Sequence, residues 1–271
     1  MPYRRAHFYV LAIFPLAVLA FWPAYLSQVS TASIDLHAHG ITATLWLALL
    51  VAQSALIHGG NSATHRTLGF CSLALFPLFL AGGSGIFLGM ARRLVANVSP
   101  FYDLYAARLA WLDIVAVAGF AWFYHQALAR RRTIGPHAGY MLATSIFLLP
   151  PILGRLAPIL PPLAITGPQD FWKLGVGFQL ANAVTAAIAL VVAVRAGRDG
   201  RPFVLAALLT ALGAVLFQFA GPLPAWRALF IRAADLPPLP FALAAAIAGC
   251  VVAYAGWRAG EDALPKAAAA A

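Results

Sequence analysis

The stretch HAHGITATLWLALLVAQSALIH, residues 37–58, joins two histidines to a long apolar run that decides the fold. The run contains no Asp, Glu, Lys or Arg. A helix needs about 20 mostly apolar residues to cross the hydrocarbon core of a bilayer. Residues 38–58 are therefore predicted to form a membrane-spanning helix.

The composition of the whole chain also indicates that it is surrounded by lipid. Of its 271 residues, 62% are hydrophobic and only 10% are charged, and the mean hydropathy is +0.84. A soluble domain carries about 25% charged residues, so this chain cannot cover a water-facing surface. Soluble enzyme folds are excluded, and the lipid bilayer is the expected partner of most of the surface.

Apolar runs of similar length recur along the chain. They predict an all-α fold, a polytopic transmembrane helix bundle of seven or eight spans that forms a single membrane-embedded domain over 1–271. The spans are placed at 7–27, 38–58, 66–90, 104–129, 137–156, 171–195, 202–220 and 239–258. A short interfacial helix is expected near 222–234, between proline turns, and a disordered tail at 263–271. The N-terminal apolar run is longer than a signal-peptide core and is expected to be a retained first span.

Basic residues lie in short clusters between the apolar runs. The densest clusters, ARRRT at 129–133 and RAGRDGR at 195–201, fall on one side of the predicted membrane. The positive-inside rule assigns that side to the cytoplasm, which also places both termini there. The net charge of +10 is explained by this pattern, and nucleic acid is not an expected partner.

Small residues in the spans indicate close packing of helices. GIFLG at 85–89 is a small-xxx-small motif, which favours a tight helix contact. Cys71 and Cys250 each lie inside an apolar run and are interpreted as packing residues, since the chain has no CxxC or CxxCH.

The span at 38–58 carries a polar stripe. At about 100° per residue, His39, Thr42, Trp46 and Gln53 fall on one face, while His37 points to the opposite side. The stripe can make hydrogen bonds to neighbouring helices, or it can face a cofactor or a polar cavity.

Asp113 is the residue whose placement inside the predicted bundle costs the most free energy. It lies well inside the span at 104–129, where a carboxylate needs a partner, a proton or water. Arg155, at the end of the span at 137–156, is the candidate partner from a neighbouring helix. Asp113 is either half of a structural ion pair or a carboxylate that handles protons.

The remaining histidines gather at the predicted cytoplasmic boundary. Bis-histidine ligation of haem b needs two imidazoles on different helices at the same depth. His65 and His137 meet this condition as first residues of their spans, and His58 and His125 form a second candidate pair as last residues. Each is alternatively an interfacial residue, or a group that exchanges protons with the cytoplasm.

The first half of the chain, 7–156, resembles a family of uncharacterised bacterial multi-pass membrane proteins, the DUF2306-like group. The likeness rests on HAHG with a following Trp and Gln, on HRTLG, on an Asp before an arginine-rich loop, and on H-x-x-x-M-L-A-T followed by a terminal Arg. The family positions are His39, Gly40, Trp46, Gln53, His65, Arg66, Gly69, Asp113, His137, Met141 and Arg155. Ala138 and Gly139 depart from the usual Lys and Arg. The second half, 157–262, holds three further spans without a motif of this family.

This resemblance implies a bacterial inner-membrane protein but no established activity. Its histidines are loosely similar to those of haem-b membrane cytochromes of the b561 kind. The first functional expectation is an electron-transfer module that binds haem b and works with a quinone or another redox partner. The alternatives are a proton-coupled or small-solute membrane transporter and a non-catalytic structural or assembly protein.

Overall fold

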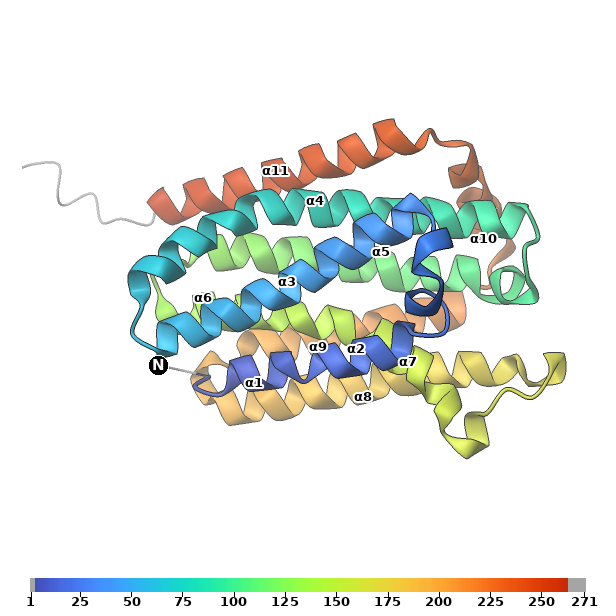
Figure 1. Cartoon of the computed structure of the whole chain (residues 1–271), viewed down its shortest axis with the longest axis horizontal. Helices are drawn as coiled ribbons and strands as arrows, with labels where there is room; N and C mark the ends of the chain where they lie inside the picture. The colour runs from blue at the N-terminus through green and yellow to red at the C-terminus, as the bar shows by residue number, and fades with distance from the viewer. Residues whose placement is uncertain (1–2, 263–271) are drawn as a thin grey trace, which may run out of the picture.

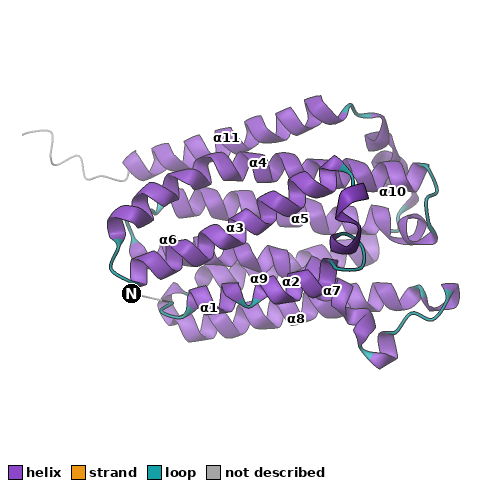
Figure 2. Cartoon of the chain, viewed as in Figure 1, coloured by secondary structure: helices purple, strands orange, loops and turns teal. Residues whose placement is uncertain are grey.

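The computed structural model describes residues 3–262, and the predicted tail at 263–271 lies outside these described residues. Every regular element in this range is a helix, and the long helices lie side by side in one bundle (Figure 1, Figure 2). An all-helical chain suits a lipid environment, because a helix satisfies its own backbone hydrogen bonds.

Seven helical segments within residues 3–262 are long and apolar enough to cross a membrane. They are α3 (Ile34–His58), α4 (Ser62–Val95), α5 (Pro100–Ala129), the segment Ile134–Ile159, α8 (Trp172–Ala196), α9 (Arg201–Val215) with its π turn (Leu216–Ala220), and α11 (Pro238–Asp262). These segments fit a multi-pass membrane protein and overlap the last seven predicted spans. The short helix expected near 222–234 is α10 (Pro224–Arg232).

The first predicted span, 7–27, is helical over a shorter length. Its helices α1 (Ala6–Leu11) and α2 (Ile13–Phe21) form one apolar stretch, Ala6–Phe21, of about 24 Å, which is less than the roughly 30 Å of a hydrocarbon core. The stretch is interrupted at Ala12 because Pro15 has no N–H to donate to the Leu11 carbonyl. Its crossing of a membrane stays a prediction. Figure 1 shows the stretch running alongside the bundle, with the start of α1 at the same end as the last turn of α11.

The segment Ile134–Ile159 is a broken helix. It consists of α6 (Ile134–Ala143), a 3-10 segment (Thr144–Leu148), α7 (Leu149–Leu156) and a final 3-10 turn (Ala157–Ile159). The proline pair at 150–151 was expected to interrupt the helix, and the interruption lies just before it, because two prolines cannot donate to the carbonyls four residues earlier. The break sets the direction of α7 and of Arg155 near its end.

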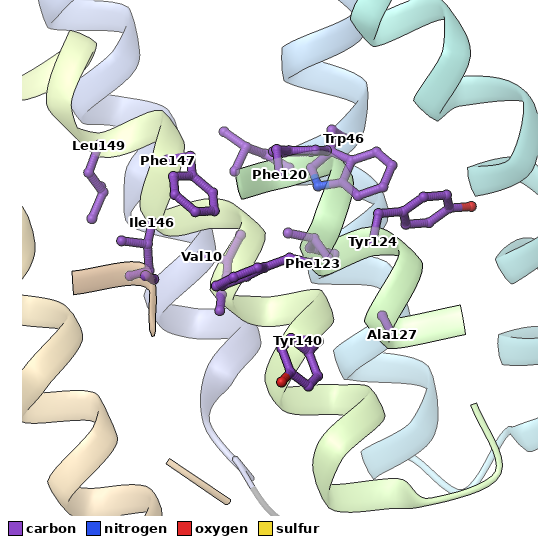
Figure 3. Close-up of a cluster of buried hydrophobic side chains, with 14 of the residues drawn as sticks. Val10, Trp46, Phe120, Phe123, Tyr124, Ala127, Tyr140, Ile146, Phe147 and Leu149 are labelled. Carbon is purple, nitrogen blue, oxygen red and sulfur yellow. The ribbon is translucent and has the colours of Figure 1, made fainter. Parts of the chain in front are cut away.

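A layer of aromatic side chains fills the middle of the bundle, as Figure 3 shows. Trp46, Phe76, Phe120, Phe123 and Tyr124 are each at most 1% exposed. The rings of Trp46 and Phe120 have centroids 4.9 Å apart, and those of Phe76 and Tyr124 are 4.4 Å apart. Where lipid replaces water, such dense packing holds helices together.

Helices α3 and α4 approach each other closely along a row of glycines. A Cβ on Gly82 would lie 2.9 Å from the Cα of His39, and one on Gly85 would lie 2.9 Å from the Cβ of Asp35. A Cβ on Gly89 would lie 2.8 Å from the Asp35 carboxylate. The tight contact predicted from GIFLG is therefore confirmed, and it begins one turn earlier, at Gly82.

We expect Gly82→Ala to lower the thermal stability of the detergent-solubilised protein, by about 1–3 kcal/mol, because the new methyl would overlap the α3 backbone. Gly83→Ala is the matched control, since a Cβ there would meet only the His39 ring, at 3.9 Å. Equal melting temperatures for the two variants would contradict the close approach.

Candidate functional site

Asp113 and Arg155 come together inside the bundle. Asp113 is the fourteenth residue of α5, about 20 Å along the helix axis from its first residue. Its carboxylate interacts electrostatically with the guanidinium of Arg155 on α7, as the sequence led us to expect. The direct ion pairs among residues 3–262 join other side chains, so Asp113 and Arg155 do not form one.

Arg155 is surrounded by helices and is nevertheless exposed. Its Nη1 donates a hydrogen bond to the Pro151 carbonyl over 2.9 Å, and its Cζ lies 4.6 Å from the centroid of the Phe21 ring on α2. It also interacts electrostatically with Tyr102 on α5 and with His39 on α3. The interactions of Arg155 therefore extend to three other helices. We call the group formed by Arg155, Asp113, His39, Tyr102 and Phe21 the polar recess.

His39 forms the α3 wall of the polar recess. Its ring lies 5.6 Å from the ring of Phe79, and its backbone is pressed against Gly82. The ring atom Nδ1 is buried and has no hydrogen-bond partner. A buried polar atom without a partner is costly, so this imidazole is a group that a proton, water or ligand can satisfy.

Further polar pairs lie on the first turns of α3, next to the polar recess. His37 Nδ1 and the Tyr25 hydroxyl are 2.9 Å apart, so His37 does face away from His39. The Asp35 carboxylate lies 3.9 Å from Arg93 on α4, and the Arg93 guanidinium lies 5.7 Å above the Tyr102 ring. Tyr102 thus interacts with two arginines, Arg93 and Arg155.

The remainder of the α3 stripe points into the bundle. Trp46 Nε1 donates a hydrogen bond to the Thr144 hydroxyl, at 3.0 Å, which ties α3 to the 3-10 segment. The Gln53 side chain lies over Gly69 of α4, where a Cβ would be 3.3 Å from Nε2, while its Oε1 is buried without a partner. Thr42 bonds to carbonyls of its own helix. The stripe therefore makes one interhelical side-chain bond, and its two ends are incompletely satisfied.

His65 and His137, the first candidate haem pair, are neighbours. His65 is in the first turn of α4 and His137 in the first turn of α6, and the two side chains interact electrostatically. Each ring places Nδ1 against a backbone carbonyl, at 3.2 Å from that of Gln53 and at 2.9 Å from that of Ala127. When Nδ1 donates in this way, Nε2 carries the lone pair that can bind a metal or a proton.

The second candidate pair is arranged differently. The ring of His58 lies 6.2 Å from that of His7, and its Nδ1 is 2.7 Å from the Ser54 carbonyl. The backbone of His125 packs against α11, where a Cβ on Gly256 would lie 2.9 Å from the His125 carbonyl oxygen. Across residues 3–262, no three His, Cys, Asp or Glu side chains gather in a way that could hold a metal ion.

Sequence reasoning did not identify Phe21 and Tyr102 as parts of the site. Phe21 contacts Arg155 only because α2 packs against α7. Tyr102, in the first turn of α5, interacts electrostatically with Arg155. Neither aromatic residue belongs to a local pattern that distinguishes it.

Accessibility of the polar recess can be measured with a cysteine. In a protein with Cys71 and Cys250 replaced by alanine, Arg155→Cys is expected to react with a small hydrophilic thiol reagent, because the native side chain is exposed. Ala110→Cys on α5, where the native residue is 0% exposed, should react only after denaturation. Equal protection of the two cysteines in the folded protein would show that the recess is closed.

In comparisons with protein families, curated proteins and solved structures, no family model, no curated protein and no solved structure matches this chain.

Proposed function

We propose that this integral membrane protein is a proton-coupled or small-solute transporter whose binding site is the polar recess. The observation that carries the proposal is the exposed Arg155 guanidinium, which interacts electrostatically with Asp113 inside the bundle. An ionisable residue within a membrane span marks a functional site by default, since it costs about 2.5–3.5 kcal/mol on insertion.

A purely structural role would call for a direct ion pair. Buried charges are stabilised when good geometry satisfies most of their hydrogen-bonding atoms. Arg155 instead directs Nη1 to the carbonyl of its own helix and packs against Phe21, and Asp113 is not hydrogen-bonded to it. This arrangement leaves donors and acceptors that a transported species can use.

The broken helix supports the same interpretation. Transporters commonly build binding sites where a membrane helix is interrupted, because irregular backbone is tolerated beside a cavity. Here the 3-10 segment (Thr144–Leu148) lies directly before α7, which carries Arg155. Thr144 in this segment also accepts the hydrogen bond from Trp46, so a change in the conformation of the segment would alter its contact with α3.

Proton flux tests the role of Asp113. In liposomes with a trapped pH-sensitive dye, we expect Asp113→Asn to reduce the flux driven by an imposed potential at least about tenfold, because the amide cannot carry a proton. Asp103→Asn is the matched control on the same helix, since the exposed Asp103 pairs with Arg227 at the end of the bundle. Identical flux through all three proteins and through protein-free liposomes would refute proton coupling.

A second candidate function is haem-b binding by His65 and His137. The specific observation is that both rings present Nε2 while Nδ1 is held by a backbone carbonyl. Neutral imidazoles fixed in this way fit bis-histidine ligation in their donor chemistry. A haem bound there would supply one-electron transfer, with a quinone or another redox partner as its counterpart.

The haem proposal predicts a visible spectrum. Protein purified from haem-replete cells should show a Soret band, with α and β bands that sharpen on reduction with dithionite. His65→Ala or His137→Ala should abolish the spectrum, whereas His37→Ala, at the other end of α3, should retain it. A colourless wild-type protein would exclude this second function without bearing on the first.

A further inference from the structure

A groove of about 320 Å³ lies between the short helix α10 and the span α4, at the end of the bundle where α11 begins (Figure 1). Phe87 forms its wall on α4, and side chains of α10 and of the turn after it form the opposite wall. The volume falls within the range of about 300–1,000 Å³ that is common for ligand pockets. We call this space the α10 groove.

Helix α10 presents one apolar face to the groove. Trp226, Leu229, Phe230 and Ala233 follow the spacing i, i+3, i+4 and i+7, so they lie on one side of the helix. The Phe230 ring packs against that of Phe87, with centroids 5.2 Å apart, and is 1% exposed. Leu229 remains 58% exposed. The rest of the protein therefore covers only part of this face.

The α10 groove offers almost no hydrogen-bonding group to a polar solute. The indole N–H of Trp226 already donates to the Ala107 carbonyl of α5, at 2.6 Å. The other polar side chain in the lining is Arg232. Burying a polar group without a partner is unfavourable, so the occupant of the groove must be hydrocarbon over most of its length.

The groove extends from the end of the bundle toward its middle. Arg92 on α4 donates hydrogen bonds to the carbonyls of Ala234 and Leu236, at 3.2 and 2.8 Å, and so holds the turn after α10 at its own level. Phe87 comes five residues before Arg92, which places it about 7.5 Å further along α4 toward the middle of the bundle. Because α10 joins two membrane-spanning segments, this direction leads from the membrane boundary into the hydrocarbon.

The mouth of the α10 groove is positively charged. Arg232 is exposed and makes no hydrogen bond or ion pair among residues 3–262. The exposed Arg92 also has no carboxylate partner there, whereas Arg93 and Arg227 are paired with aspartates. Asp235 is the carboxylate on the turn after α10. Two guanidinium groups and one carboxylate leave one net positive charge, which complements a singly negative head group.

We propose that the α10 groove binds one acyl chain of an anionic phospholipid, whose phosphate is held by Arg232. This site is separate from the polar recess, and the proposal does not depend on transport. A neutral lipid would fill the groove but leave Arg232 without an anion. A second copy of the chain fits less well, because two-fold pairing across the groove would bring two positively charged mouths together.

Native mass spectrometry of the full-length protein in detergent tests the proposal with two phospholipids. Dioleoylphosphatidylglycerol and dioleoylphosphatidylcholine have the same chains and differ in the net charge of the head group. We expect the first phosphatidylglycerol to bind at least about tenfold more tightly, because its phosphate is not neutralised within its own head group. A phosphatidylglycerol with a photoreactive acyl chain should crosslink to the peptides that contain Phe87 and Leu229.

Variants separate the head group from the chain. Arg232→Gln should remove the preference for phosphatidylglycerol, whereas Arg198→Gln should retain it, since the exposed Arg198 lies between α8 and α9 at the opposite end of the bundle. Ala233→Trp should weaken the binding of both lipids at least about tenfold, because the larger side chain fills the groove. Circular dichroism with a melting curve verifies folding. If Ala233→Trp does not fold, Leu229→Gln at an exposed position replaces it and should weaken both lipids severalfold.

Three results would overturn the proposal directly. They are equal affinity of the wild type for the two lipids, a preference that persists in folded Arg232→Gln, and crosslinks confined to other helices. A dimer that dissociates in Ala233→Trp would identify a second copy as the occupant and likewise overturn it. Displacement of phosphatidylglycerol by inorganic phosphate alone would show an anion site without a chain, which also rejects the proposal.

Discussion

In hydrocarbon, a backbone N–H or C=O without a partner costs several kcal/mol, and this requirement shapes the whole bundle. It explains why the described chain is helical almost throughout, and why its main departure within a span occurs at the proline pair at 150–151. There the chain tightens into a 3-10 segment, and the hydroxyls of Thr144 and Ser145 bond to the carbonyls of Met141 and Leu142. Beyond this segment, α7 packs against α2 and α8, and this packing brings Arg155 next to Phe21.

The glycine row on α4 fixes the position of His39. With no side chain at Gly82, the α4 backbone lies against that of His39, and the imidazole packs into the helix contact, against Phe79 and next to Gly83. His39 therefore combines a fixed position with an unsatisfied ring nitrogen. Dense packing on one side and missing polar partners on the other are what a binding group in a membrane bundle needs.

The sequence alone predicted the helices and several inward-facing groups, because both follow from local periodicity and from the cost of charge in lipid. The separation of His37 from His39 and the proximity of Arg155 to Asp113 are of this kind. Contacts that depend on how distant helices pack could not be derived. Phe21 beneath Arg155 is one example, and the approach of His7 to His58 is another. The early end of the first helix was also missed, since its composition remains apolar beyond Phe21 while its backbone turns away.

The aromatic layer around Trp46 separates the polar groups at the two ends of α3. His39 precedes the layer along this helix and Gln53 follows it, and the five side chains of the layer are at most 1% exposed. Tightly packed rings therefore hold the two polar ends apart. The hydrogen bond from the Trp46 indole to Thr144 joins this layer to the interrupted helix, so a rearrangement of that helix would disturb the packing between the two ends.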